Sequence, residues 1–244
     1  MTVMFKERPR PTRRDGSGAF PCNTARVYCS RHISDDEATA TLVRNIDGEL
    51  LHDPRNFSFT PGRRTRAWHK NCIALGLASG FLEPLESTSI GLVETGIEKI
   101  RMAFPDAYFN QSRVDTFNEL TAMEYERVRD FLILHYKLNG RDGKMWEYCR
   151  DMEIPGELAD KVAKFRSTGE LIRYPTEIFG PPSWLAIYNG FNVLPETYDK
   201  GVDKVDADYL KRAFTEMRQS VARAVDSVST HAEFIAEYCA APQP

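Results

Sequence analysis

One stretch of the sequence combines residue types that could carry out chemistry. The segment from Asn71 to Ile90 is an apolar run short enough to be a buried strand, then a loop with two glycines and a proline, then a carboxylate followed by three hydroxyl residues. Gly76 and Gly80 permit a positive φ or the close approach of another group to the backbone, and Pro84 stiffens the path beyond them. The pattern indicates a functional loop that leads into a helix.

Glu86 lies where that helix should begin. The free backbone amides around Ser87, Thr88 and Ser89, together with the helix dipole, would form a site suited to an anion such as chloride or a phosphate. A carboxylate beside an anion site is unusual. The plainer interpretation is that Glu86 or Ser87 is simply the N-cap of the helix, and spacing alone leaves both interpretations open.

Upstream of the loop, the pattern predicts short strands and one helix. Alternation of apolar and polar residues predicts half-buried strands over residues 26–30 and 56–60, and a further run over 63–68 could form a hairpin with the second strand. A helix between the first two strands is well marked. Its predicted signals are a Ser34–Glu37 capping box, an Ile33–Ala38 hydrophobic staple and a stop at Gly48.

Beyond about residue 86 the chain is predicted to be helical almost throughout. Apolar residues recur at helical spacing from Ile90 to Pro105, from Phe117 to Asn139, from Pro155 to Phe165 and from Leu210 to Val228, and Thr230 with Glu233 could form a new capping box. In the first of these helices the stripe expected to be buried is Ile90, Val93, Ile97 and Ile100. Residues 168–198 are rich in glycine, proline and aromatics, which is typical of an irregular wrap.

Composition narrows the class of protein. A hydrophobic fraction of 42% and a charged fraction of 27% are ordinary for a folded soluble chain, and the net charge of -3 gives no electrostatic case for nucleic acid or an anionic membrane. The basic N-terminal residues could be a nucleic-acid arm, but a solvated tail is the plainer interpretation. The five cysteines are scattered and form no C-x-x-C pair. The sequence also shows no long apolar stretch and no signal peptide, and together these observations favour a cytoplasmic protein.

The segment from Gly76 to Ile90, GLASGFLEPLESTSI, resembles the signature loop of the flavin-dependent tryptophan halogenases. The resemblance extends to residues 30–38 and 62–64, covers residues 27–104 well and the helical remainder more loosely. It implies an enzyme that uses reduced FAD from a separate flavin reductase, oxygen, and chloride or bromide. The hypochlorous acid formed would travel along an internal tunnel to a small aromatic substrate, usually tryptophan.

The resemblance also implies roles for individual residues. Glu86 matches the family's active-site glutamate, which positions the chlorinating species or takes the proton as the arene is substituted, and the amides of Thr88 and Ser89 match those that hold chloride. Ser87 matches a residue of the strap between the flavin and substrate sites. The residues expected at the flavin are Gly76, Gly80, Phe81, Pro84, Ser87 and Ile90, and those expected at the substrate are Phe179, Ser183 and Trp184.

Other aromatic and imidazole side chains have plainer interpretations. Phe179 and Trp184 could simply be rim aromatics that cover the core. His135 falls on an apolar helical stripe and is expected to be a satisfied core or boundary histidine rather than a base. The remaining histidines form no i,i+4 ligand pair, so no metal site is expected.

The resemblance is incomplete. The family begins with a strand and a G-x-G-x-x-G fingerprint that holds the FAD pyrophosphate, and its catalytic lysine and W-x-W-x-I-P motif lie in the same upstream portion, but none of these has a counterpart here. We therefore expect an α+β, mostly helical chain, with an incomplete FAD-binding monooxygenase-type domain followed by a helical C-terminal region. The expected parts are a flexible basic leader (1–24), a partial flavin-binding core (25–105) and a helical substrate-side region (106–244).

Three functional hypotheses follow. The first is a truncated halogenase-like flavoprotein that chlorinates tryptophan or a related aromatic, with a separate N-terminal fragment as a possible partner. The second is a non-catalytic gene remnant. The third is a related flavin monooxygenase without halide chemistry.

Overall fold

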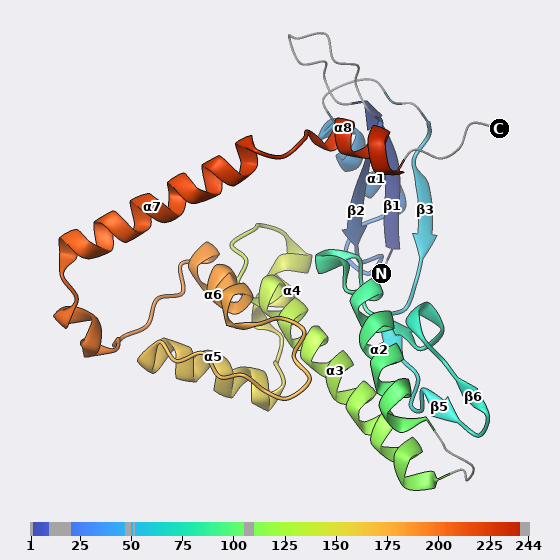
Figure 1. The fold of residues 1–244 in the computed structure, drawn as a ribbon. Coiled ribbons are helices and arrows are strands. Elements are labelled where there is room, and N and C mark those ends of the chain that lie inside the picture. The colour runs from blue at the N-terminus through green and yellow to red at the C-terminus, as the bar shows by residue number, and fades with distance from the viewer. Residues whose placement is uncertain (1, 10–20, 47–49, 51, 105–109, 240–244) are drawn as a thin grey trace. The chain divides into compact units, whose positions relative to one another are not determined.

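The computed structural model describes residues 2–9, 21–46, 50, 52–104 and 110–239 (Figure 1). The chain divides into two compact units, residues 1–196 and 197–244. Within the described ranges most residues are helical, as the sequence predicted, and the strands are few and mostly short. None of the described helices combines the length and apolarity that a membrane span would need.

A three-stranded antiparallel sheet, in the order β2-β1-β3, opens the first unit. It is formed by β1 (Thr2–Pro9), β2 (Pro21–Tyr28) and β3 (Arg55–Ser58). The expectation of a flexible leader is wrong for β1 and for the start of β2, whereas residues 10–20 lie outside the described residues. β1 pairs with strands further along the chain, β2 and β3, and local composition carries no signal of such pairing.

Pairing of β1 with β3 also overturns a second expectation. The hairpin predicted between residues 56–60 and 63–68 does not form, because β3 pairs with β1 instead. Phe57 in β3 is 51% exposed, so this strand is not half-buried as predicted.

The helix predicted after Ile33 is α1 (Asp35–Arg44). Ser34 is its N-cap and accepts a hydrogen bond from the Glu37 amide, which is one of the two bonds of the predicted capping box. Ile33 packs against the buried cluster of Tyr28, Ala38 and Leu42, as the predicted hydrophobic staple requires. The helix ends at Arg44, before the expected stop at Gly48, which lies outside the described residues.

Two small antiparallel pairs hold the loop that the sequence singled out. β4 (Gly62–Arg63) pairs with β7 (Gly80–Phe81), and β5 (Trp68–His69) pairs with β6 (Cys72–Ile73), so the predicted buried strand shrinks to two residues. Between and after these strands lie two 3-10 turns, η1 (Gly76–Ala78) and η2 (Leu85–Ser87).

Five helices complete the first unit, and α3 lies at its centre (Figure 1). They are α2 (Ser89–Ala103), α3 (Gln111–Lys137), α4 (Lys144–Asp151), α5 (Gly156–Thr168) and α6 (Pro181–Gly190). α6 corrects the prediction that residues 168–198 are irregular throughout. Gly180 is its N-cap, and two prolines occupy its first two positions, where the missing amide donors cost nothing.

The buried stripe of α2 differs from the predicted one. Leu92, Gly96 and Lys99 face inward, whereas Ile90 and Ile97 are exposed. Lys99 can lie inside because its ammonium group pairs with the buried Glu124 carboxylate of α3 at 2.5 Å.

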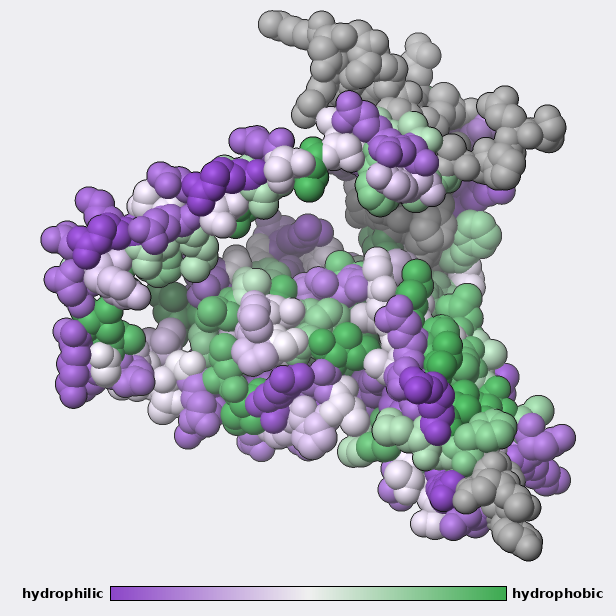
Figure 2. Space-filling model, viewed as in Figure 1, coloured by the Kyte–Doolittle hydropathy of each residue, from purple (hydrophilic) through white to green (hydrophobic). Residues whose placement is uncertain are grey.

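The second unit contains the predicted long helix, α7 (Ala207–Asp226), preceded by η3 (Lys200–Lys204) and followed by α8 (His231–Phe234) and a π-helical turn, Ile235–Cys239. The capping box between Thr230 and Glu233 is confirmed at the start of α8. Figure 2 shows hydrophilic residues along one edge of α7 and more hydrophobic ones along the other. The large apolar residues of this helix are exposed, among them Leu210, Phe214, Met217, Val221 and Val225.

Candidate functional site

The backbone of the candidate loop is strained at its acid. Glu86 has φ 66° and ψ 4°, and its neighbour Ser87 has φ 46°, so two consecutive non-glycine residues adopt the left-handed region. Such conformations cost about 1–3 kcal/mol each and persist only where the surrounding structure holds them. Earlier in the same loop, Arg64 Nε donates to the Ala78 carbonyl, and the Tyr125 hydroxyl donates to the Gly80 carbonyl at 3.2 Å.

The strained turn determines where the Glu86 side chain points. Neither Glu86 nor Ser87 caps the following helix, because the N-cap of α2 is the buried Thr88, and its side chain makes no capping hydrogen bond. The interpretation of Glu86 or Ser87 as an ordinary N-cap is therefore wrong. The first turn of α2 also contains no acidic residue, so its amide donors and helix dipole are not offset by a carboxylate of their own helix.

Glu86 instead points to His135, near the C-terminal end of α3. His135 Nε2 lies 3.1 Å from Glu86 Oε1, and the opposite ring nitrogen, Nδ1, lies 2.9 Å from the Phe131 carbonyl oxygen. A carbonyl oxygen can only accept, so Nδ1 carries a proton in this arrangement. The Nε2–Oε1 contact then requires one further proton, held either by the imidazole or by the carboxyl group. The contact is therefore a hydrogen bond only when one of the two groups carries that proton, and the two side chains are 13% and 36% exposed.

A second carboxylate of the same loop contacts the next residue of α3. The Tyr136 hydroxyl donates to Glu83 Oε2, and Glu83 Oε1 is buried without a hydrogen-bond partner among the described residues. Burial raises the pKa of the Glu83 carboxyl above its ordinary value, and the Tyr136 hydrogen bond and nearby His135 oppose the shift. Glu83 and Glu86, three residues apart in the loop, therefore contact Tyr136 and His135, which are adjacent in α3.

The residues expected at a flavin lie in different environments. Gly76 has φ +55°, and a Cβ added there would lie 3.0 Å from Val93 Cγ2, while a Cβ at Gly80 would lie 2.8 Å from Arg63 Cα. Packing and strand pairing therefore explain both glycines. Phe81 and Pro84 are half-buried, with Phe81 edge-on to Phe59, while Ile90 is 76% exposed. The flavin contacts stay predictions.

Two of the three residues expected at the substrate, Phe179 and Trp184, pack against Phe131, which in turn contacts His135. Phe179 stacks on Phe131 at 3.9 Å between ring centroids, and Phe131 in turn meets His135 edge-on. Trp184 is 2% exposed and packs edge-on against Phe131, with the Lys161 ammonium group 3.7 Å from its ring centroid. Ser183 is half-buried in the first turn of α6. Trp184 is therefore a core residue here, and substrate contact by these residues stays a prediction.

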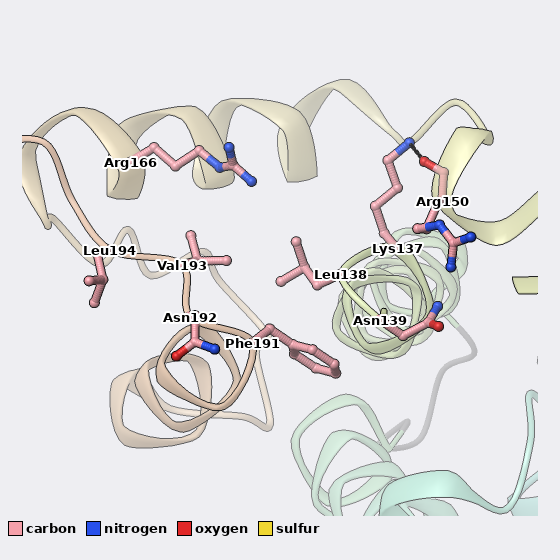
Figure 3. A pocket seen from close by; sticks show the side chains of 9 residues that line it. All are labelled: Lys137, Leu138, Asn139, Arg150, Arg166, Phe191, Asn192, Val193 and Leu194. Carbon is pink, nitrogen blue, oxygen red and sulfur yellow. Dashed lines mark hydrogen bonds between the residues drawn. The ribbon is translucent and has the colours of Figure 1, made fainter. Parts of the chain in front are cut away.

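Two cavities lie near α3. One, of about 370 Å³, is lined by Lys137, Arg150 and Arg166 (Figure 3), but the Lys137 ammonium group already donates to the Arg150 and Met152 carbonyl oxygens. The other, of about 620 Å³, has mostly apolar walls and includes Glu83 and Tyr136. Within the described ranges no group of three His, Cys, Asp or Glu residues could hold a metal ion.

Comparison with known proteins identifies the class. The family described as tryptophan halogenase matches residues 21–207, and this chain belongs to that family. It is 30% identical to 7-chloro-L-tryptophan 6-halogenase KtzR of Kutzneria sp. (strain 744) over 87% of this chain and 42% of the relative.

Solved structures agree with the family match. BrvH, a flavin-dependent halogenase from Brevundimonas sp. BAL3, superposes with a TM-score of 0.84 at 43% identity, over 96% of this chain and 51% of that one. Xcc4156, a flavin-dependent halogenase from Xanthomonas campestris, superposes with a TM-score of 0.87 at 33% identity, over 100% of this chain and 52% of that one. The chain thus spans about half the length of the relatives that it matches, and the resemblance seen in the loop is confirmed.

His135 is the residue of this site whose importance the sequence did not reveal. It was expected to be a satisfied boundary histidine, and both of its nitrogens are indeed engaged, but one of them engages the candidate catalytic acid. The only sequence signal was its position on the buried stripe of α3, four residues after Phe131.

Proposed function

We propose that this chain is the halide-binding and acid-bearing part of a flavin-dependent halogenase that chlorinates or brominates an aromatic substrate such as tryptophan. The observation that carries the proposal is the orientation of Glu86. The acid turns away from the start of α2 and meets His135, which leaves the helix start without a carboxylate cap.

Halide binding is the role proposed for the start of α2. The amides of Thr88 and Ser89 belong to a helix terminus with no side-chain cap and no acidic residue in its first turn. Free amides and the positive end of the helix dipole favour an anion by about 0.3–1 kcal/mol at an exposed site, and by more where water is excluded. Chloride or bromide, being small and monovalent, suits such a site.

The flavin would lie over the loop that carries Gly76 to Ile90. Three exposed apolar side chains lie in η1, in η2 and at the start of α2, namely Leu77, Leu85 and Ile90, and they fit contact with a flat, largely apolar ring system. When bound in reduced form, FAD would supply the reducing equivalents that convert oxygen and halide into an electrophilic halogen species. The ADP half would be held by a segment other than the one matched here.

Glu86 and His135 would manage the proton of the substitution. Replacement of an aromatic hydrogen by halogen releases one proton, which needs a nearby base. Glu86 can accept that proton when the proton of the Glu86–His135 contact resides on His135, and His135 orients the carboxylate through Nε2 while the Phe131 carbonyl fixes the ring through Nδ1. Phe179, stacked on Phe131, and Ser183 would contribute to the substrate side of this arrangement.

The test is a halogenation assay of the purified chain. The chain, supplied with reduced FAD by a flavin reductase, oxygen and tryptophan, should form a product whose mass carries chlorine or bromine according to the halide added. A flavin-binding segment, added as a separate polypeptide, forms a second arm of the assay. Oxygenated product at an equal rate without halide would favour a halide-independent monooxygenase, and absence of any product in both arms would overturn the proposal.

A further inference from the structure

Two cysteine side chains from distant parts of the sequence line one cavity. Cys29 directly follows β2, Cys149 lies in α4, and both belong to the wall of the cavity of about 620 Å³ that also includes Glu83. Both thiols are free. Cys72 and Cys239 are also free, but they are exposed and are not part of this wall. The fold therefore selects one pair from the free thiols of the described residues.

Packing of the turn after β2 against α4 keeps Cys29 and Cys149 close. The His32 amide donates to the Cys29 carbonyl oxygen at 2.9 Å, which closes a turn over residues 29–32. The His32 ring packs against the ring of Tyr148, the residue before Cys149, with 5.6 Å between the ring centroids. The two thiols are also near enough to influence each other electrostatically. These observations agree that the thiols are neighbours in the cavity wall.

The two thiols lie in different environments. Cys29 is half-buried, whereas Cys149 is 8% exposed. Burial raises the pKa of the Cys149 thiol, and the nearby Cys29 adds to the shift. Because the thiolate is the form that attacks an oxidant, Cys149 is a poor first nucleophile. A small oxidant that enters the cavity should therefore react first with Cys29, while Cys149 stays beside it as a thiol.

We propose that Cys29 and Cys149 form a redox-active pair, which hydrogen peroxide oxidises to an intramolecular disulfide and a dithiol reductant restores. In the first step the Cys29 thiolate attacks one peroxide oxygen, the O–O bond breaks, and Cys29 sulfenic acid and hydroxide form. In the second step the Cys149 sulfur attacks the Cys29 sulfur and the S–O bond breaks. The departing hydroxide takes the Cys149 proton and leaves as water. Together the two thiols lose two electrons and two protons, and one peroxide becomes two water molecules.

The pair needs neither flavin, halide nor an aromatic substrate, so the inference stands apart from the proposed function. Disulfides that form in a reducing compartment are usually transient and serve catalysis or redox sensing. A disulfide here would join the turn after β2 to α4 at the wall of the cavity. Because Glu83 lines the same cavity, the cross-link would alter the surroundings of the candidate loop.

Peptide mapping of the full chain tests the pairing. The reduced chain is treated with stoichiometric hydrogen peroxide, remaining thiols are blocked with iodoacetamide, and the product is digested with trypsin without a reductant. Cleavage after lysine and arginine places Cys29 in the peptide of residues 27–31 and Cys149 in that of residues 145–150. We expect these two peptides to form the main disulfide, and dithiothreitol to separate them. In urea the unfolded chain should pair its five cysteines without this preference.

Three variants assign the roles. Cys149→Ser should leave Cys29 as a sulfenic acid that dimedone traps, and Cys29→Ser should leave Cys149 as a thiol. Cys72→Ser, at an exposed cysteine outside the cavity, is the matched control and should form the same cross-link as wild type. The inference would be overturned by an identical disulfide map in the folded and the unfolded chain, or by a cross-link of Cys29 to Cys72, Cys239 or a second chain. Survival of both thiols, or sulfenic acid at Cys29 of wild type without a disulfide, would overturn it as well.

Discussion

The carboxylate of Glu86 and the imidazole of His135 lie 3.1 Å apart, although 49 residues separate them in the sequence. The contact depends on an unfavourable backbone conformation at Glu86 and Ser87 on one side, and on the Phe131 carbonyl that fixes the imidazole on the other. Strain of this kind is commonly held at functional sites, because a relaxed turn would release the side chain from the position that chemistry needs.

Substitution of either partner should therefore impair halogenation. We expect Glu86→Gln to lower kcat by about 10²-fold or more, in the range usual for a proton-transfer group, and His135→Gln to have a smaller effect because it removes orientation rather than the base itself. Steady-state product formation measures both, with Glu98→Gln, at an exposed acid of α2 that pairs with Arg101, as control. An unchanged kcat in Glu86→Gln would remove Glu86 from the chemistry.

Trp184 tests whether the aromatic cluster behind His135 is a core or a substrate wall. Its side chain is buried among Phe131, Tyr188 and the Lys161 ammonium group, so Trp184→Ala should lower the free energy of unfolding by about 3–5 kcal/mol. Trp184→Phe should cost less, since most of the ring contact remains. Urea titration followed by circular dichroism measures both. A stable Trp184→Ala variant that lost only substrate affinity would assign this residue to substrate binding instead.

The sequence predicted those features of the chain that depend on residues close to one another in the sequence. The cap of α1 at Ser34, the capping box at Thr230 and the functional loop from Gly76 to Ile90 each depend on residues within a few positions of one another. β1 was missed for two reasons. One partner, β3, lies far along the chain, and the other, β2, follows residues whose composition suggested a flexible leader. Contacts that join separate segments need the fold, and the Glu86–His135 contact is of that kind.

The pairing of Lys99 with Glu124 explains why the predicted stripe of α2 was displaced, and it can be tested separately. The side chains are 8% and 5% exposed, and their charged atoms are 2.5 Å apart. Lys99→Met leaves the Glu124 carboxylate buried without its partner and should destabilise the chain by about 3–5 kcal/mol. The double variant Lys99→Met/Glu124→Leu should recover most of that loss. Urea unfolding of the two variants measures the difference, and equal stability of both would mean that the pair is not coupled.

Glu83 should make stability depend on pH in a defined direction. Burial raises its pKa in the folded chain above the ordinary value of 4.5, so between those two values the folded state binds more protons than the unfolded state does. The stabilisation is complete below pH 4.5 and is lost as pH rises through the folded pKa.

Glu83→Gln cannot ionise, and its free energy of unfolding should therefore gain on that of wild type as pH rises from about 4.5 toward neutrality. Urea titrations at several pH values measure this difference. Asp130, whose pKa burial also raises, contributes the same trend to both proteins and cancels in the comparison. A difference that stays constant with pH, or that moves in favour of wild type, would show that Glu83 is not buried as an acid beside Tyr136.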